Sequence, residues 1–121
     1  LDPSCGSGRM LLASSRIAGP DQYYFGIDLD QTCVKMTALN LFLSGIFHGE
    51  VMCANALVPG EFTVSYKTSF LPFGLFRILD KEKSRLWNMY QHTFKKADVA
   101  KHPPPEFDDS RLDTGSQLTI F

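Results

Sequence analysis

The sequence lacks the features that define disulfide-rich, zinc-binding, membrane-spanning and secreted proteins. Its 121 residues include three cysteines, Cys5, Cys33 and Cys53, and no CxxC pair. This odd, widely spaced set argues against a disulfide framework or a zinc site, so we expect free thiols in a reducing cytoplasm. No apolar run approaches the length of a membrane span, and no signal peptide is visible. The expectation is a cytoplasmic protein without a membrane or metal partner.

An excess of charge of one sign is also missing. Lys and Arg total 12, Asp and Glu total 13, and the formal net charge is −1. Nucleic-acid-binding domains usually carry a net basic field, and this chain does not supply one; a DNA-directed enzyme could carry it on another domain or subunit. The chain is 44% hydrophobic and 21% charged. These values are ordinary for a globular protein, and the length is enough for one modest domain.

The most informative stretch is the opening one, LDPSCGSGRMLL. It predicts the end of a strand, a turn at Gly6 and Gly8, and the start of a helix. Glycine lacks a Cβ, so the backbone can take positive φ and approach a ligand closely. A helix N-terminus also favours an anion. A dinucleotide fingerprint would need a third glycine where Leu11 stands. Because a strand is already ending at Leu1, we expect the interior of a longer protein or a truncated reading frame.

The residues that follow alternate between helical and strand patterns. Gly19 and Pro20 suit a helix end, and the Asp30 carboxylate suits a helix start. The predicted elements are a helix over residues 9–17, a strand over 23–28, a helix over 31–43 and a strand over 51–54. Strands separated by helices are typical of an α/β fold with a doubly wound, mostly parallel sheet.

Three motifs in order resemble those of adenine-specific DNA methyltransferases. Asp-Pro-x-x-Gly-Ser-Gly, from Asp2 to Gly8, resembles motif I. Gly26–Asp30 resembles motif II, where an acid ends the second strand, and Cys53–Leu57 is similar to motif III. Between them, Ala38–Ile46 looks like the family's Asn-Leu-x-x-x-Gly helix end. The nearest resemblance is to the modification subunit of type I restriction–modification systems, and it covers residues 1–57.

This resemblance implies a fold, a cofactor and a reaction. The fold would be the Rossmann-like fold of S-adenosylmethionine (SAM)-dependent methyltransferases, incomplete in this chain. The reaction would be methyl transfer from SAM to the exocyclic amine of adenine in DNA. DNA would be bound through missing domains or partner subunits, with specificity and restriction subunits as candidate partners. Residues 1–57 would be the SAM-binding βαβ half of the methyltransferase domain.

The resemblance also implies which residues bind SAM. They lie in the glycine turn and at the ends of strands: Asp2, Pro3, Cys5, Gly6, Gly8, Asp28, Leu29, Asn55 and Ala56. The Asp2 carboxylate would face the methionine part of SAM, whose ammonium and sulfonium are positive. The alternative for Asp2 is a turn or helix-capping aspartate.

Asp28 and Asn55 would contact the nucleoside. A carboxylate at the end of a second strand can accept hydrogen bonds from ribose hydroxyls. Asp30 is the competitor for this role, although we assign it to the helix cap. Leu29 would then flank the adenine ring. The Asn55 amide can both donate to and accept from adenine, or it can simply belong to a surface turn.

The catalytic motif of the family, Asn/Asp-Pro-Pro-aromatic, is not found in the sequence. His102–Phe107, HPPPEF, lacks the Asn or Asp acceptor and has Glu in place of the aromatic residue. In the family this motif binds the target amine and stacks on the extruded base, as base-modifying enzymes require. We therefore assign no catalytic residue and expect no activity from this chain.

The remaining residues give weaker predictions. Residues 58–101 form a divergent region with a weak strand at 62–66 and a long amphipathic helix at 77–96. Trp87 and Tyr90 are expected to be packing residues on one face of this helix. The apolar segment 70–76 is either a loop on the core or an exposed interaction patch. Residues 102–121 are expected to be a mobile, Pro-rich and polar tail, with a strand pattern at 118–121. Two other functions stay open, namely a degenerate, non-catalytic interaction module and a methyltransferase for RNA, protein or a small molecule.

Overall fold

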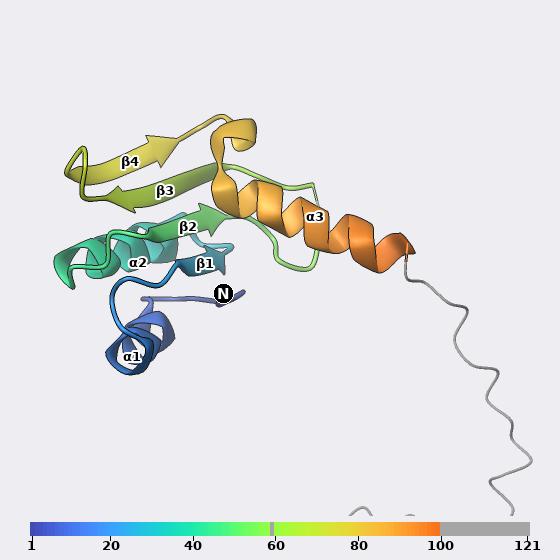
Figure 1. Cartoon of the computed structure of the whole chain (residues 1–121). Coiled ribbons are helices and arrows are strands. Elements are labelled where there is room, and N and C mark those ends of the chain that lie inside the picture. The colour runs from blue at the N-terminus through green and yellow to red at the C-terminus, as the bar shows by residue number, and fades with distance from the viewer. Residues whose placement is uncertain (59, 100–121) are drawn as a thin grey trace, which may run out of the picture.

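The computed structural model describes residues 1–58 and 60–99 and shows a small α/β unit (Figure 1). Its elements are α1 (Arg9–Ala18), β1 (Tyr24–Asp28), α2 (Gln31–Leu43), β2 (Gly49–Cys53), β3 (Val64–Ser69), β4 (Gly74–Ile78), the 3-10 helix η1 (Lys81–Lys83) and α3 (Arg85–Val99). The first four confirm the expected elements to within two residues at each end. The Asp30 side chain caps α2 by accepting a hydrogen bond from the Thr32 N–H at 2.7 Å.

The four strands form one mixed sheet in the order β1-β2-β3-β4. β1 and β2 are parallel, whereas β2–β3 and β3–β4 are antiparallel. Asp2 adds an isolated parallel bridge to Gly26 on the outer side of β1. The expected mostly parallel sheet is therefore corrected to a mixed one. The physical reason is the connection after β2, residues 54–63. Its described residues, 54–58 and 60–63, form no helix, and the connection is shorter than the ~12 residues of a parallel crossover.

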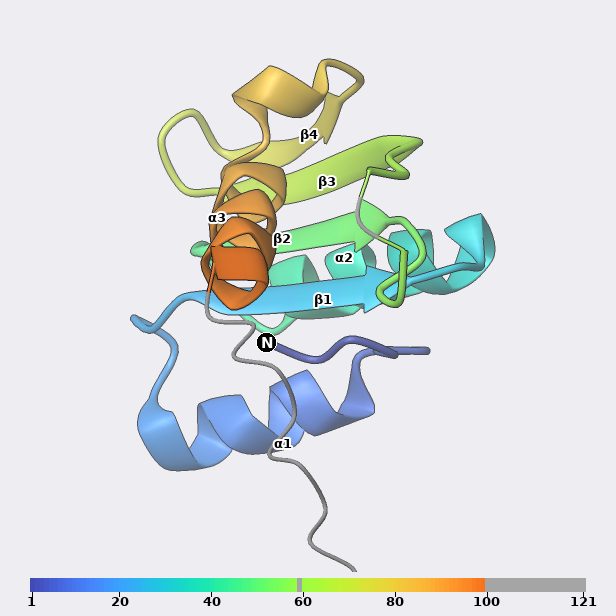
Figure 2. The same cartoon turned by 90° about the vertical axis from the view of Figure 1, so that its right-hand side faces the viewer.

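Helices cover both faces of the sheet, so β2 is buried along its whole length (Figure 2). Val51 and Cys53 pack in the core under α1 and α2. Met52 packs in a second core with Leu86 and Trp87 of α3, on the opposite face. This alternation follows from the period of two along a strand.

The expected helix over residues 77–96 is wrong over residues 77–84. Gly74–Ile78 is β4, and α3 begins only at Arg85. The Ser84 hydroxyl accepts a hydrogen bond from the Trp87 N–H at 3.0 Å and fixes this later start. Trp87 and Tyr90 are buried, which confirms their packing role.

The apolar segment 70–76 forms the tip of the β3–β4 hairpin and the start of β4. Phe70, Leu71 and Phe73 are 59%, 85% and 66% exposed. The segment is thus an exposed tip, although the Phe70 and Phe73 rings contact Phe47. The weak strand expected at 62–66 is present as β3, shifted toward its C-terminal side.

β3, β4 and α3 share the sheet and the core with the first 57 residues. The expected proline-rich tail at 102–121, the HPPPEF segment and the strand pattern at 118–121 lie outside the described residues. Among the described helices, none is long and apolar enough to cross a lipid bilayer.

Candidate cofactor site

The glycine turn lies at the carboxyl end of β1. The Asp2 N–H donates to the Phe25 carbonyl at 2.8 Å, and the Ile27 N–H donates to the Asp2 carbonyl at 2.8 Å. Just after this bridge the Cys5 N–H donates to the Ile27 carbonyl at 2.9 Å. The chain then turns through Gly6 and enters α1. The turn is therefore anchored to the edge of the sheet where parallel strands of open α/β folds place ligands.

The Asp28 carboxylate joins the glycine turn to the start of α2. Its Oδ2 accepts from the Gly6 N–H at 2.9 Å, and its Oδ1 accepts from the Asp30 N–H at 2.9 Å. Asp28 is half-buried at the end of β1. A carboxylate has about four lone-pair positions, so each Asp28 oxygen keeps capacity for a further donor.

Two side chains of α2 donate hydrogen bonds to backbone carbonyls of the same turn. The Thr37 hydroxyl donates to the Gly6 carbonyl at 2.7 Å, and the Asn40 amide donates to the Ser7 carbonyl at 2.9 Å. Thr37 was not identified from the sequence, because a threonine inside a helix carries no distinctive signal. Asn40 was within the quoted Asn-Leu-x-x-x-Gly pattern, and its contact gives that pattern a structural role.

The two glycines of the turn have different surroundings. Both have positive φ, 53° at Gly6 and 83° at Gly8. A Cβ on Gly6 would meet no atom within 4 Å, whereas one on Gly8 would lie 2.8 Å from Cγ2 of Thr37. Gly6 thus presents open backbone, while Gly8 allows α1 and α2 to approach closely. Gly8 is also the N-cap of α1, and no side chain caps that helix end.

The Asn55 side chain lies at the same edge of the sheet as Asp28. Asp28 pairs with Cys53 in the β1–β2 register, and the Ala54 N–H donates to the Asp28 carbonyl at 3.1 Å. The Asn55 Oδ1 accepts from the Leu57 N–H at 3.0 Å, as in a turn. The structure thus brings the two expected nucleoside contacts onto adjacent strand ends.

The remaining expected residues surround this edge. Pro3 and Leu29 are exposed, and the Asp2 Oδ1 accepts from the Ser4 N–H at 3.1 Å, as a turn aspartate does. The Ala56 carbonyl accepts from the Tyr90 hydroxyl, so α3 supports the end of β2. Among the described residues, no three His, Cys, Asp or Glu side chains are grouped to hold a metal ion.

The Cys5 side chain points into the core and not toward the open edge. It is 5% exposed, and burial raises the pKa of its thiol to about 11. A raised pKa lowers the thiolate fraction at a given pH, and thiolate is the reactive form. Desolvation also raises the pKa of the Cys33 thiol, so the difference in accessibility sets the order. We expect iodoacetamide at pH 8 to modify partly exposed Cys33 before Cys5, as read by peptide mass spectrometry. Equal rates for the two thiols in the folded protein would contradict this burial.

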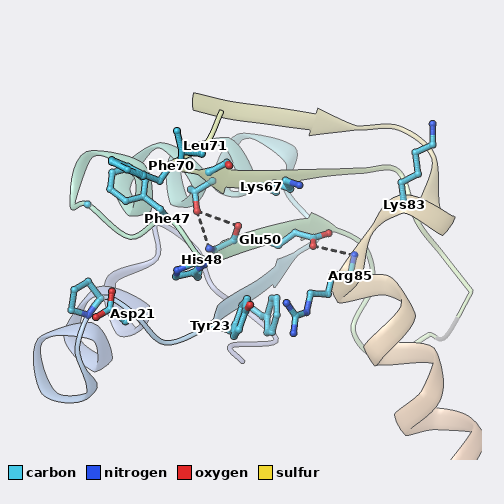
Figure 3. A pocket seen from close by; sticks show the side chains of 16 residues that line it. Asp21, Tyr23, Phe47, His48, Glu50, Lys67, Phe70, Leu71, Lys83 and Arg85 are labelled. Atoms are coloured by element: carbon cyan, nitrogen blue, oxygen red, sulfur yellow. Dashed lines mark hydrogen bonds between the residues drawn. The ribbon is translucent and has the colours of Figure 1, made fainter. Parts of the chain in front are cut away.

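Two pockets lie away from the centre of this edge. One of about 530 Å³ is lined by Asp2, Pro3 and residues of α1. A larger one of about 570 Å³ lies at the opposite edge, by the amino ends of β1 and β2 (Figure 3), and none of the nine expected cofactor residues lines it.

Comparison with known proteins gives one family. A family model described as N-6 DNA methylase matches residues 1–97. Neither the curated proteins nor the solved structures gave a match. The match extends past residue 57, where the quoted motifs end, through β3, β4 and most of α3. Since it spans residues 1–97 of 121, this chain belongs to the N-6 DNA methylase family.

Proposed function

We propose that this chain supplies the SAM-binding portion of a Rossmann-like methyltransferase that acts on the exocyclic amine of adenine in DNA. The observation that carries the proposal is the hydrogen bond from the Gly6 N–H to Asp28 Oδ2. It ties the glycine turn to the acid of the next strand, with Asn55 on the strand beside it. Family membership supports the reaction class.

The residues at this edge fit the chemistry of SAM. The uncapped N-terminus of α1 offers N–H groups to a carboxylate. The Asp2 carboxylate lies nearby to offset the cationic methionine part. Asp28 would accept from the ribose hydroxyls, Asn55 would pair with adenine, and exposed Leu29 would flank its ring. When bound, SAM supplies the methyl group that is transferred.

Removing the Asp28 carboxylate should weaken SAM binding. We expect Asp28→Ala to raise the Kd at least about tenfold, which corresponds to about 1.4 kcal/mol, because both the ribose acceptor and the anchor of the Gly6 turn are lost. Isothermal titration calorimetry with SAM measures the change. Asp28→Asn keeps an acceptor oxygen for the turn and separates loss of anchoring from loss of charge.

The matched control for this experiment is Asp21→Ala, which removes one exposed carboxylate at the opposite edge. It should bind SAM like the unmodified chain. Equal affinity of the Asp28→Ala and Asp21→Ala proteins, both folded by circular dichroism, would refute the assigned site.

We also propose that this chain does not methylate DNA alone, because the sequence has no Asn/Asp-Pro-Pro-aromatic motif to bind the target amine. An assay with labelled SAM and adenine-containing DNA tests this, and robust transfer would contradict it.

A second candidate is a non-catalytic interaction module. The exposed hairpin tip with Phe70, Leu71 and Phe73 favours it, since contiguous apolar surface often marks a contact site. A folded chain that binds no SAM would support the interaction-module function and would contradict the SAM-binding proposal.

A further inference from the structure

The small net charge of the chain hides an uneven distribution. Residues 64–99 contain seven Lys and Arg residues and three acids, Asp80, Glu82 and Asp98. Residues 1–63 contain three basic residues and six acids. The β3–β4 hairpin, η1 and α3 therefore form a basic half next to an acidic half that holds the expected cofactor edge. Clustered Lys and Arg on one part of a domain are the electrostatic footprint of nucleic-acid binding.

Three of these cations line the larger pocket (Figure 3). Lys67 comes from β3, Lys83 from η1 and Arg85 from the first turn of α3. All three side chains are exposed. Among the residues that the structure describes, none accepts a hydrogen bond from their charged groups or pairs with them as a carboxylate. Lys67 and Arg85 carry their charges at the pocket, and Lys83 carries its charge at the rim, where its side chain extends away from the other two (Figure 3).

Two acids, Glu50 and Asp21, line the same pocket and leave it a formal charge of +1, three cations less two acids. Glu50 is 4% exposed, and its Oε2 accepts from the Arg85 and Leu86 N–H groups at 3.1 and 3.2 Å. Its Oε1 accepts from two serine hydroxyls. The Glu50 carboxylate thus binds the N-terminus of α3, whose positive end partly offsets its charge. The other acid, Asp21, is an exposed residue of the rim.

Aromatic rings accompany the cations. The Arg85 guanidinium carbon lies 3.9 Å from the Tyr23 ring centroid, and that ring stacks on Phe25 at 6.1 Å. Stacking on a ring leaves the N–H edges of a guanidinium free to bind phosphate. Across the pocket Phe47 and Phe70 are also in ring contact, at 5.3 Å, and Phe70 is more than half exposed.

We propose that this pocket binds single-stranded nucleic acid. Exposed rings take unpaired bases by stacking, and a basic groove takes the phosphates, which is how single strands are bound without sequence preference. The site is distinct from the cofactor edge, because the two ends of five-residue β1 lie about 13 Å apart at 3.3 Å per residue. It therefore stands whether or not SAM binds at Asp28.

Fluorescence anisotropy with labelled oligo(dT) of about twelve nucleotides tests the proposal, a length within the span of one single-strand-binding domain. If three phosphates are neutralised, log K should fall against log salt with a slope of about −2, at about −0.7 per phosphate. The triple variant Lys67→Gln/Lys83→Gln/Arg85→Gln should bind at least about tenfold more weakly and show a nearly flat salt dependence. Phe70→Ala keeps the charge and should lose the preference for oligo(dT) over a duplex of equal length.

The matched control is Arg9→Gln/Arg16→Gln/Lys35→Gln, which removes the same charge from exposed positions on α1 and α2. This variant should bind oligo(dT) within about twofold of the unmodified chain. Three results would overturn the proposal: no oligo(dT) binding at low salt, equal losses in the two triple variants, or duplex binding as tight as oligo(dT). Circular dichroism of each variant verifies that it is folded.

Discussion

Replacing Glu50 by alanine should lower the free energy of unfolding by about 4 kcal/mol. The side chain accepts four hydrogen bonds, from the Ser65 and Ser84 hydroxyls and the Arg85 and Leu86 N–H groups. A buried donor left without a partner costs about 1–3 kcal/mol, and partial relaxation keeps the total below the sum. Because domains are stable by only about 5–15 kcal/mol, the loss is a large share of the total.

Urea unfolding followed by circular dichroism measures this loss. Glu50→Gln keeps the volume but places an amide nitrogen against two of the donors, so we expect a cost of about 3 kcal/mol. The control is Glu61→Ala, at an exposed position, where a change within about 0.5 kcal/mol is expected. If Glu50→Ala were no more destabilising than Glu61→Ala, Glu50 would not be what joins α3 to the sheet.

Gly8→Ala should be the most damaging change in the glycine turn, at about 3 kcal/mol. A φ of 83° costs a residue with a Cβ about 1–2 kcal/mol. The new Cβ would also lie 2.8 Å from Cγ2 of Thr37, a packed contact whose relief costs about 1–3 kcal/mol. Thermal and urea unfolding of the variant give the change.

Gly6→Ala is the matched variant, because its φ is also positive while its Cβ would meet open space. We expect only the backbone cost there, about 1–2 kcal/mol. Adding Thr37→Ala should recover part of the stability lost in Gly8→Ala and none of that lost in Gly6→Ala. Equal losses in the two glycine variants would contradict the close packing of α1 on α2.

Local signals account for the elements that could be predicted. The Asp30 carboxylate does cap α2, and α1 does end before Gly19, as short-range cap and turn chemistry indicated. β1 could be predicted from its aromatic and β-branched residues. The same residues placed the glycine turn and Asp28 at one edge, because carboxyl ends of parallel strands meet there.

Features that depend on distant partners could not be predicted. Gly74–Ile78 forms a strand because it pairs with β3. In the sequence its last apolar residues could not be separated from the apolar pattern of α3, so they were assigned to the helix. Glu50 gives no local sign that it caps a helix 35 residues later, at Arg85. Thr37 supports the glycine turn through contacts with Gly6 and Gly8, which lie far from it in the sequence and close to it only in the fold. The uneven charge could be read from the sequence, but the overall balance of −1 concealed it.

Amide NMR during a SAM titration shows whether the adenosyl cofactor binds at the edge of the sheet that holds the glycine turn. If it does, we expect saturable shifts in the N–H signals of Gly6, Asp28 and Asn55, with those of Tyr23 and Lys67 unchanged. Shifts centred on Tyr23 and Lys67, or no shifts at millimolar SAM in a well-dispersed spectrum, would contradict binding at this edge.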